Sequence, residues 1–162
     1  MLDSRQTAPA RKPLYTSAER ARRDQSRWTL VQGILAPVQF LVFAVSLVLV
    51  LRYMLTGNGY DVATLSIVVK TGCLFAIMMT GAIWEKVVFG QYLFAPAFFW
   101  EDVFSFVVIF LHTLYITALF AGSMAPDSLM IVALAAYTAY VINAGQFIWK
   151  LRMARRDAGV PA

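Results

Sequence analysis

Three carboxylic acids and one lysine stand close together between two long apolar runs of the sequence. The segment WEKVVFGQYLFAPAFFWED contains Glu85, Lys86, Glu101 and Asp102. Carboxylic acids and amines are common general acids and bases, above all where partial burial adjusts their protonation. The sequence also has one histidine, His112, eleven residues after Glu101. These residue types predict proton transfer beside aromatic side chains.

Several other kinds of site are excluded by the sequence. It has no phosphate-binding glycine motif, no HExxH, no CxxC and no Gly-x-Ser-x-Gly. A haem held by two histidines would need a second copy of the chain to supply the other histidine. The single cysteine, Cys73, allows neither an internal disulfide nor a cysteine-rich metal site.

The composition is that of a membrane protein. Hydrophobic residues fill 60% of the 162 positions, against roughly 45–50% in soluble domains. A bilayer-spanning helix needs about 20 predominantly apolar residues, and four stretches qualify: 28–55, 62–88, 103–122 and 128–151. The expected fold class is therefore an all-α integral membrane protein, a bundle of four transmembrane helices.

Positive charges predict the orientation, because segments rich in Lys and Arg tend to stay in the cytoplasm. Seven precede the first span and four lie at the end of the last, whereas 56–61 and 122–127 have none. Both termini are therefore expected to be cytoplasmic. A capping box from Thr16 to Glu19 predicts a short amphipathic helix before the first span. The net charge of +5 then reflects topology and anionic lipid, and no nucleic-acid partner is expected.

The expected organisation has three parts. A cytoplasmic tail with the short charged helix covers 1–27, a four-helix transmembrane domain covers 28–153, and a second cytoplasmic tail covers 154–162. This topology places Glu85 at the end of the second span and Glu101 at the start of the third, on the same side of the membrane. The alternative is that these acids have only a structural role, as interfacial charges that are favourable near a helix N-terminus.

Polar residues also recur along one face of the first and last spans. Seven-residue intervals separate Gln32, Gln39, Ser46 and Tyr53, and helical spacing aligns Asn143, Gln146 and Lys150. Lipid cannot satisfy amides, so both stripes are expected to face the bundle interior. There they serve either as contacts between helices or as ligand contacts in a pocket that opens toward the cytoplasm. Both roles stay open.

Two ionisable residues fall deep in the membrane. Lys70 and His112 are expected at similar depths in antiparallel spans. Such residues cost at least about 2.5–3.5 kcal/mol unless they are partnered or neutral, which makes both functional candidates. The structural alternatives are a Lys70 side chain that reaches the outer interface and a hydrogen-bonded core histidine.

Three stretches, 20–43, 80–115 and 133–152, resemble the 2-vinyl bacteriochlorophyllide hydratases of phototrophic bacteria. The motifs WEKVVFG and FFWEDVFS carry most of the resemblance, which covers nearly the whole chain after Tyr15. The resemblance implies an enzyme of bacteriochlorophyll biosynthesis that adds water to the C3 vinyl group of chlorophyllide a or 3-vinyl bacteriochlorophyllide a. It further implies a multi-pass protein of the bacterial inner, intracytoplasmic membrane, with other enzymes of pigment biosynthesis as candidate partners.

This hydration starts with protonation of the terminal vinyl carbon, and water then attacks the carbon attached to the macrocycle. Glu101 and Asp102 are the candidates for proton donor and base, with Glu85 as the alternate. Glu101 is expected to matter most, because it shares a helix face with His112. Lys86 is the candidate partner of the substrate's propionate. Other candidate substrate contacts are Trp84, Phe98, Phe99, Trp100, Gln32, Gln39, Asn143 and Gln146.

His112 is the candidate axial ligand of the substrate's magnesium, and no separate cofactor is expected. Glu101 and His112 are about 16 Å apart along the helix axis, so one macrocycle reaches both only if it stands upright or the side chains converge. Two alternative functions, from other classes of protein, remain. One is a small proton-coupled transporter, which usually has a mid-membrane carboxylate, and the other is a non-catalytic pigment-binding or assembly protein of the photosynthetic membrane.

Overall fold

The computed structural model describes residues 13–158, and this part of the chain is helical without any strand. The helices are α1 (Ser17–Gln25), α2 (Arg27–Thr56), α3 (Tyr60–Phe89), α4 (Phe99–Ala121) and α5 (Pro126–Ala158). Helices α2 to α5 are each long and apolar enough to cross a membrane, which confirms the predicted all-α fold with four spans. Helix α4 starts before the predicted span, because the helix includes the two acids that a hydropathy pattern leaves outside.

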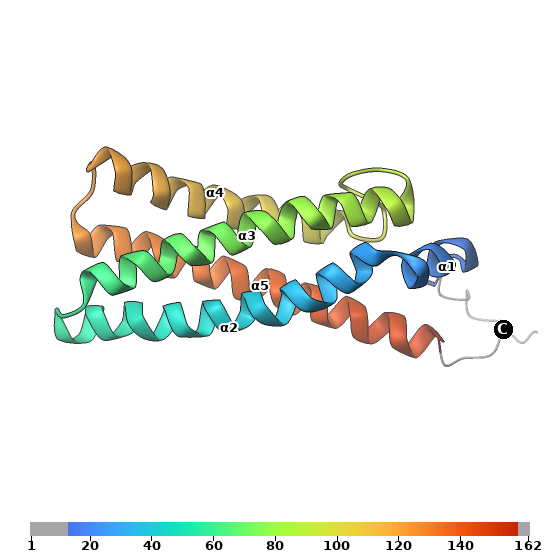
Figure 1. Ribbon diagram of the computed structural model, residues 1–162, viewed down its shortest axis with the longest axis horizontal. Helices are drawn as coiled ribbons and strands as arrows, with labels where there is room; N and C mark the ends of the chain where they lie inside the picture. The colour runs from blue at the N-terminus through green and yellow to red at the C-terminus, as the bar shows by residue number, and fades with distance from the viewer. Residues whose placement is uncertain (1–12, 159–162) are drawn as a thin grey trace, which may run out of the picture.

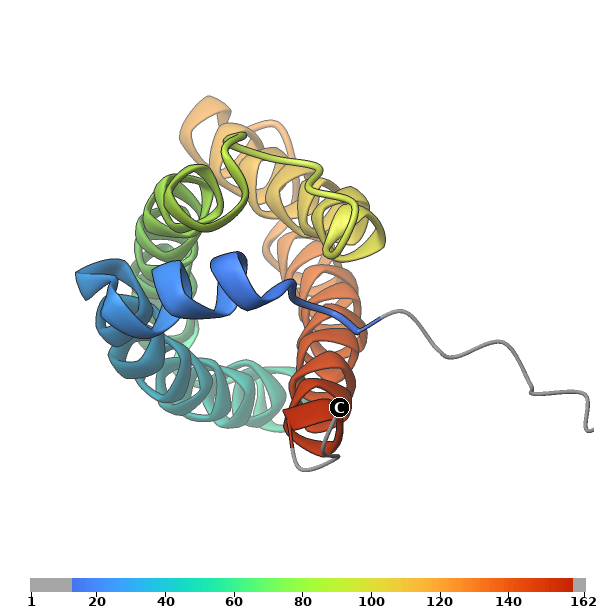
Figure 2. The same ribbon diagram turned by 90° about the vertical axis from the view of Figure 1, so that its right-hand side faces the viewer.

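The four long helices form two antiparallel hairpins, α2 with α3 and α4 with α5 (Figure 1). Contacts within each hairpin are extensive, whereas contacts between the hairpins are sparser. Seen from one end, the four helices surround a common axis (Figure 2). The main apolar core lies toward the 57–59 and 122–125 connections, around Val50, Ile67 and Tyr115. The opposite half of the bundle therefore holds most of the buried charged groups.

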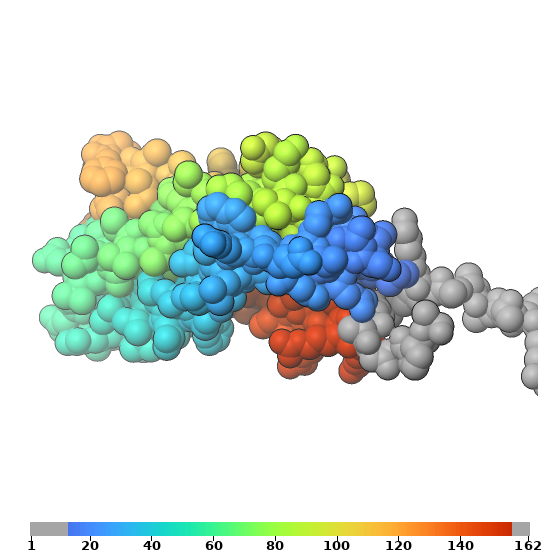
Figure 3. Space-filling view, turned by 45° about the vertical axis from the view of Figure 1, so that its right-hand side comes forward, coloured from blue at the N-terminus to red at the C-terminus, as the bar shows by residue number. Residues whose placement is uncertain are grey.

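Helix α1 lies across the end of the bundle where the 90–98 loop is also found (Figures 2 and 3). It begins with the predicted capping box, in which the Thr16 hydroxyl accepts the Glu19 backbone N–H and the Glu19 carboxylate accepts that of Thr16. Just before it, the Tyr15 ring is buried and stacks on Phe89 at 5.8 Å between centroids. The N-terminal segment thus packs onto this end of the bundle.

The orientation of the bundle across the membrane stays a prediction. We expect the end that carries α1 to face the cytoplasm, because Lys and Arg concentrate there. A cysteine introduced at Asn58, in a Cys73→Ser background, should react with a membrane-impermeant thiol reagent only from the outer side. Labelling of this cysteine from the cytoplasmic side alone would reverse the topology.

Candidate active site

The 90–98 loop brings the ends of α3 and α4 together. Gly90 ends α3 with a left-handed backbone (φ 87°), which glycine adopts readily. Phe94 is also left-handed (φ 59°), a conformation that a bulky residue keeps only where its surroundings impose it. Its backbone N–H donates to Asp102 at 2.6 Å, and the next N–H in the chain donates to Glu85 at 3.2 Å. The loop is therefore built around two carboxyl groups.

Glu85 and Asp102 form a carboxyl pair. Their side chains come from different helices and lie close enough to share a hydrogen bond, and the two residues are only 5% and 3% exposed. A hydrogen bond between two carboxyl groups needs a proton on one of them, because a carboxylate has only acceptors. The repulsion between two buried like charges also opposes ionisation of both. The carboxyl pair is therefore suited to hold one transferable proton inside the bundle.

Glu101 has a different partner, Lys150 of α5, with 2.6 Å between Nζ and Oε2. One turn along α4, the Ser105 hydroxyl donates to the Glu101 carbonyl and accepts the Asn143 side-chain N–H, each at 2.8 Å. The Asn143 Oδ1 atom is buried and has no hydrogen-bond partner among residues 13–158. Buried polar atoms are normally satisfied, often by water. The arrangement thus offers a carboxyl group paired with a lysine and an open hydrogen-bond acceptor on neighbouring helices.

Aromatic side chains pack beside these charged groups. Phe98 is 2% exposed and packs against Trp84 and Phe147, with 5.6 and 5.9 Å between ring centroids. The Lys150 Nζ atom lies 5.2 Å from the centre of the Phe98 ring. The Trp84 Nε1–H also donates to Thr29, which ties α3 to α2. Phe98 and Trp84 therefore belong to a packed aromatic cluster at the same end of the bundle as the ion pair of Glu101 and Lys150.

The structure does not bring three of the predicted substrate contacts close to the carboxyl groups. Phe99 and Trp100 are 44% and 64% exposed, as expected of aromatic residues that anchor a helix at the membrane interface. Lys86 is exposed, and its Nζ donates to the Gly90 carbonyl. One step along a helix turns a side chain by about 100°, so Lys86 faces away while Glu85 faces the interior. Lys86 is poorly placed to hold a propionate within the bundle.

A second group of polar side chains lies deeper, around His112. This residue is fully buried, and its Nδ1 lies 2.8 Å from the Val108 carbonyl oxygen. A carbonyl only accepts, so Nδ1 must carry the proton and Nε2 keeps its lone pair. Nε2 has no hydrogen-bond partner in the part of the chain that the structure describes. An imidazole held in this tautomer is suited to bind a metal ion.

Lys70 is also fully buried and lies close enough to His112 to act on it electrostatically. Its Nζ sits 3.8 Å from the centre of the Tyr140 ring. One turn earlier on α5, the Tyr137 ring is 6.0 Å from that of His112. Lys70 thus points into the bundle and does not reach the outer interface. Neither tyrosine could be singled out from the sequence, because both continue the apolar pattern of the last span.

The polar amides of the sequence face neighbouring helices. Gln32 donates to Thr80 at 2.7 Å and links α2 to α3. Gln39 is 2% exposed, and within the described residues neither of its amide atoms has a hydrogen-bond partner. The Gln146 Oε1 atom is likewise buried and unsatisfied over 13–158. Such atoms mark interior positions where water or a ligand would complete the hydrogen bonding.

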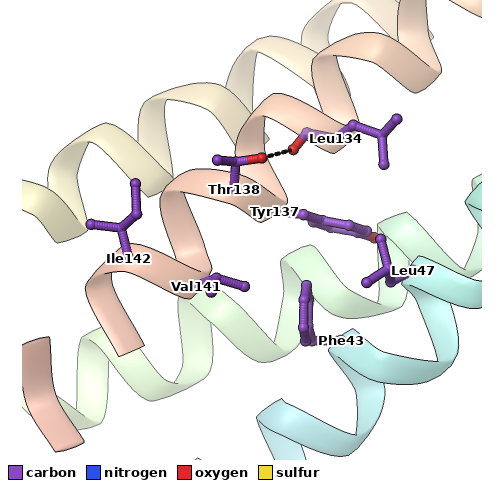
Figure 4. A pocket seen from close by; sticks show the side chains of 7 residues that line it. All are labelled: Phe43, Leu47, Leu134, Tyr137, Thr138, Val141 and Ile142. Atoms are coloured by element: carbon purple, nitrogen blue, oxygen red, sulfur yellow. Dashed lines mark hydrogen bonds between the residues drawn. The ribbon is translucent and has the colours of Figure 1, made fainter. Parts of the chain in front are cut away.

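Two apolar cavities open on the flanks of the bundle. The larger, of about 450 Å³, lies between α2 and α5 (Figure 4). Its wall includes Tyr137, whose ring lies 6.0 Å from that of His112, so this tyrosine stands between the cavity and the deep polar group. The other, of about 390 Å³, lies between α2 and α3. The lining of the larger cavity is Phe43, Leu47, Leu134, Tyr137, Thr138, Val141 and Ile142.

Comparison with known proteins gives close matches. The model of a family described as 2-vinyl bacteriochlorophyllide hydratase matches residues 15–153. A curated protein of that name from Rhodobacter capsulatus is 70% identical over 151 residues, which cover 93% of this chain and 87% of the relative. One of the same name from Cereibacter sphaeroides is 71% identical, with 93% and 92% covered. No solved structure matches the chain.

Proposed function

The chain belongs to the 2-vinyl bacteriochlorophyllide hydratase family, and we propose that its carboxyl pair, Glu85 and Asp102, protonates the vinyl group of the substrate. It is a hydratase of bacteriochlorophyll biosynthesis, an enzyme of the hydro-lyase kind. Its substrate on this proposal is chlorophyllide a or 3-vinyl bacteriochlorophyllide a. The observation that supports the assignment is the close approach of two buried carboxyl groups, which can share a hydrogen bond only if one of them carries a proton.

The reaction begins when the pair donates its proton to the terminal carbon of the vinyl group. The π electrons of the double bond form the new C–H bond, and a cation remains on the carbon attached to the macrocycle. Conjugation with the macrocycle spreads this charge. Phe98 and Trp84, whose rings pack on each other at this end of the bundle, are the candidates to stabilise the cation further through a ring face. The carboxyl pair is left with one negative charge more than before.

Water then attacks the cation and loses a proton. The Asn143 Oδ1 atom, buried and open, accepts a hydrogen bond from this water, and Ser105 holds the Asn143 side chain in place. Glu101, which is paired with Lys150, is the base that takes up the released proton. Return of a proton to the carboxyl pair restores the starting state, so the net change is addition of one water molecule.

His112 provides the axial ligand of the substrate's magnesium in this proposal, through the free Nε2 lone pair. The macrocycle then stands upright between the hairpins, with its vinyl edge toward the carboxyl pair and its centre near His112. No cofactor is required beyond the magnesium that the substrate carries.

Four apolar helices make the chain a multi-pass membrane protein. We place it in the inner, intracytoplasmic membrane, where its substrate's hydrophobic macrocycle partitions, and where other enzymes of pigment biosynthesis are candidate partners. Incubation of membranes that contain the chain with chlorophyllide a tests the activity. A blue-shifted 1-hydroxyethyl product supports the hydratase, whereas bound but unchanged pigment would favour a pigment-holding protein.

Loss of the His112 imidazole should weaken binding of the magnesium chlorin selectively. We expect His112→Ala to raise the dissociation constant of chlorophyllide a by about tenfold or more, equivalent to about 1.4 kcal/mol. The metal-free pigment should bind the variant as it binds the wild type, because an empty macrocycle offers the imidazole no metal. Titration of both pigments by absorbance measures the difference. An equal loss for both pigments would leave His112 as a packing residue.

A further inference from the structure

Lys70 and Gln39 are buried polar residues that take no part in the proposed proton transfer at the carboxyl pair. We propose that they bind the propionate carboxylate of the pigment and so select the free acid over its esters. This inference rests on the proposed function, because it takes the substrate to be a chlorophyllide. It replaces Lys86, which is exposed on the outside of α3, as the partner of the propionate.

The first supporting observation is that both groups are buried and lack hydrogen-bond partners. Lys70 is 0% exposed and Gln39 is 2% exposed. The Lys70 Nζ and both amide atoms of Gln39 lack hydrogen-bond partners within residues 13–158. A buried amine or amide without a partner costs free energy that the fold must offset. A ligand that supplies acceptor atoms would remove this cost.

The second support is the chemistry of the donors. Lys70 contacts the face of the Tyr140 ring, which supplies no acceptor oxygen. Among residues 13–158 its described contacts include no ion pair with an acid. An amine and an amide N–H are donors that suit the two oxygens of a carboxylate. Away from water, a charge-assisted hydrogen bond of this kind is stronger than a neutral one.

The third support is location. Lys70 lies near His112, and Gln39 is one helical turn from Phe43, whose ring packs on that of Tyr140. A macrocycle with its magnesium on His112 therefore has its edge within the same region. The propionate and the vinyl group are on different pyrrole rings of the pigment, so anchoring one can orient the other. This orientation directs the vinyl edge toward Glu85 and Asp102.

The test compares chlorophyllide a with its propionate methyl ester on the wild type, Lys70→Met and Gln39→Leu. The ester keeps the macrocycle and the magnesium but loses the negative charge. We expect the wild type to bind the free acid about tenfold to a hundredfold more tightly than the ester, as a charged hydrogen bond implies. Lys70→Met should lose most of that preference by weakening the acid alone, and Gln39→Leu should lose part of it.

Lys86→Met is the matched control, because it removes a lysine from the same helix at an exposed position, and it should keep the preference. Lys70→Met removes an unsatisfied buried group, so the variant should unfold at a temperature no lower than the wild type. Equal weakening of acid and ester, or no weakening of either, would overturn the proposal. Binding is read by absorbance without turnover, so a wild type that binds the acid selectively but makes no product would refute the hydration and leave this inference standing.

Discussion

Exchange of both carboxyl groups of the pair for amides, Glu85→Gln with Asp102→Asn, is expected to slow hydration of chlorophyllide a by about 10²–10⁴-fold. The amide oxygens can still accept the two backbone N–H groups of the 90–98 loop that the carboxyl oxygens accept now. The loop should therefore keep its conformation, and pigment binding should be unchanged. The loss is confined to the transferable proton, so it appears in turnover. Single-turnover formation of the hydroxyethyl product measures it.

Asp61→Asn is the control for this experiment. Asp61 lies on the same helix as Glu85, but it is exposed in the first turn at the opposite end of α3. Its replacement should leave the rate unchanged. Each single replacement in the pair keeps one carboxyl group, so its rate should fall between those of the wild type and the double variant. If the double variant binds pigment and hydrates it at the wild-type rate, the pair only holds the loop.

Separate loss of Glu101 or Lys150 is expected to reduce both stability and activity. Each leaves the other charge without its partner at a largely buried position, at a cost of about 2–3 kcal/mol in the free energy of unfolding. The double variant Glu101→Gln with Lys150→Met removes both charges and should recover most of that stability. It should remain at least about 10²-fold slower than the wild type, because the base that accepts the proton from water is gone.

Denaturation in detergent and single-turnover rates on the same preparations separate the two effects. Recovery of activity together with stability would mean that the ion pair serves the fold alone. Recovery of neither would mean that the pair is needed for insertion, and Glu101 would lose its assignment as the base.

The sequence predicted the spans well because hydropathy and helix length depend on local composition. The same holds for the polar stripes, since helical spacing alone puts Gln39 and Asn143 on interior faces. Helical spacing also places Lys150 on the same face of α5 as Asn143, where it pairs with Glu101. Its spacing was visible in the sequence, but its partner on another helix was not.

The ranking of the acids could not be predicted in this way. Glu85 and Asp102 meet because the 90–98 loop folds back with Phe94 in a left-handed conformation, and no local pattern indicates that conformation. The sequence favoured Glu101 because it shares a helix face with His112. In the proposed mechanism its ion pair with Lys150 supports the role of base instead.

The two lysines of α3 differ in burial because they lie on different sides of the helix. Lys86 is exposed and Lys70 is buried on α3, although the sequence also allowed the Lys70 side chain to reach the outer interface. A hydropathy pattern locates a lysine in depth but does not say toward which neighbour it points. Only packing against α5, through Tyr140, decides this.

Proton transfer from the carboxyl pair to the vinyl group is tested most directly by the isotopes in the product. Chlorophyllide a is incubated in deuterium oxide enriched in heavy oxygen, with the wild type and with Glu85→Gln/Asp102→Asn, and the hydroxyethyl product is analysed by mass spectrometry at early times. We expect the wild type to place deuterium on the terminal carbon and heavy oxygen on the carbon attached to the macrocycle, and the pigment-bound double variant to give almost no labelled product. Labelled product from the double variant at the wild-type rate would contradict the assignment of the proton to Glu85 and Asp102.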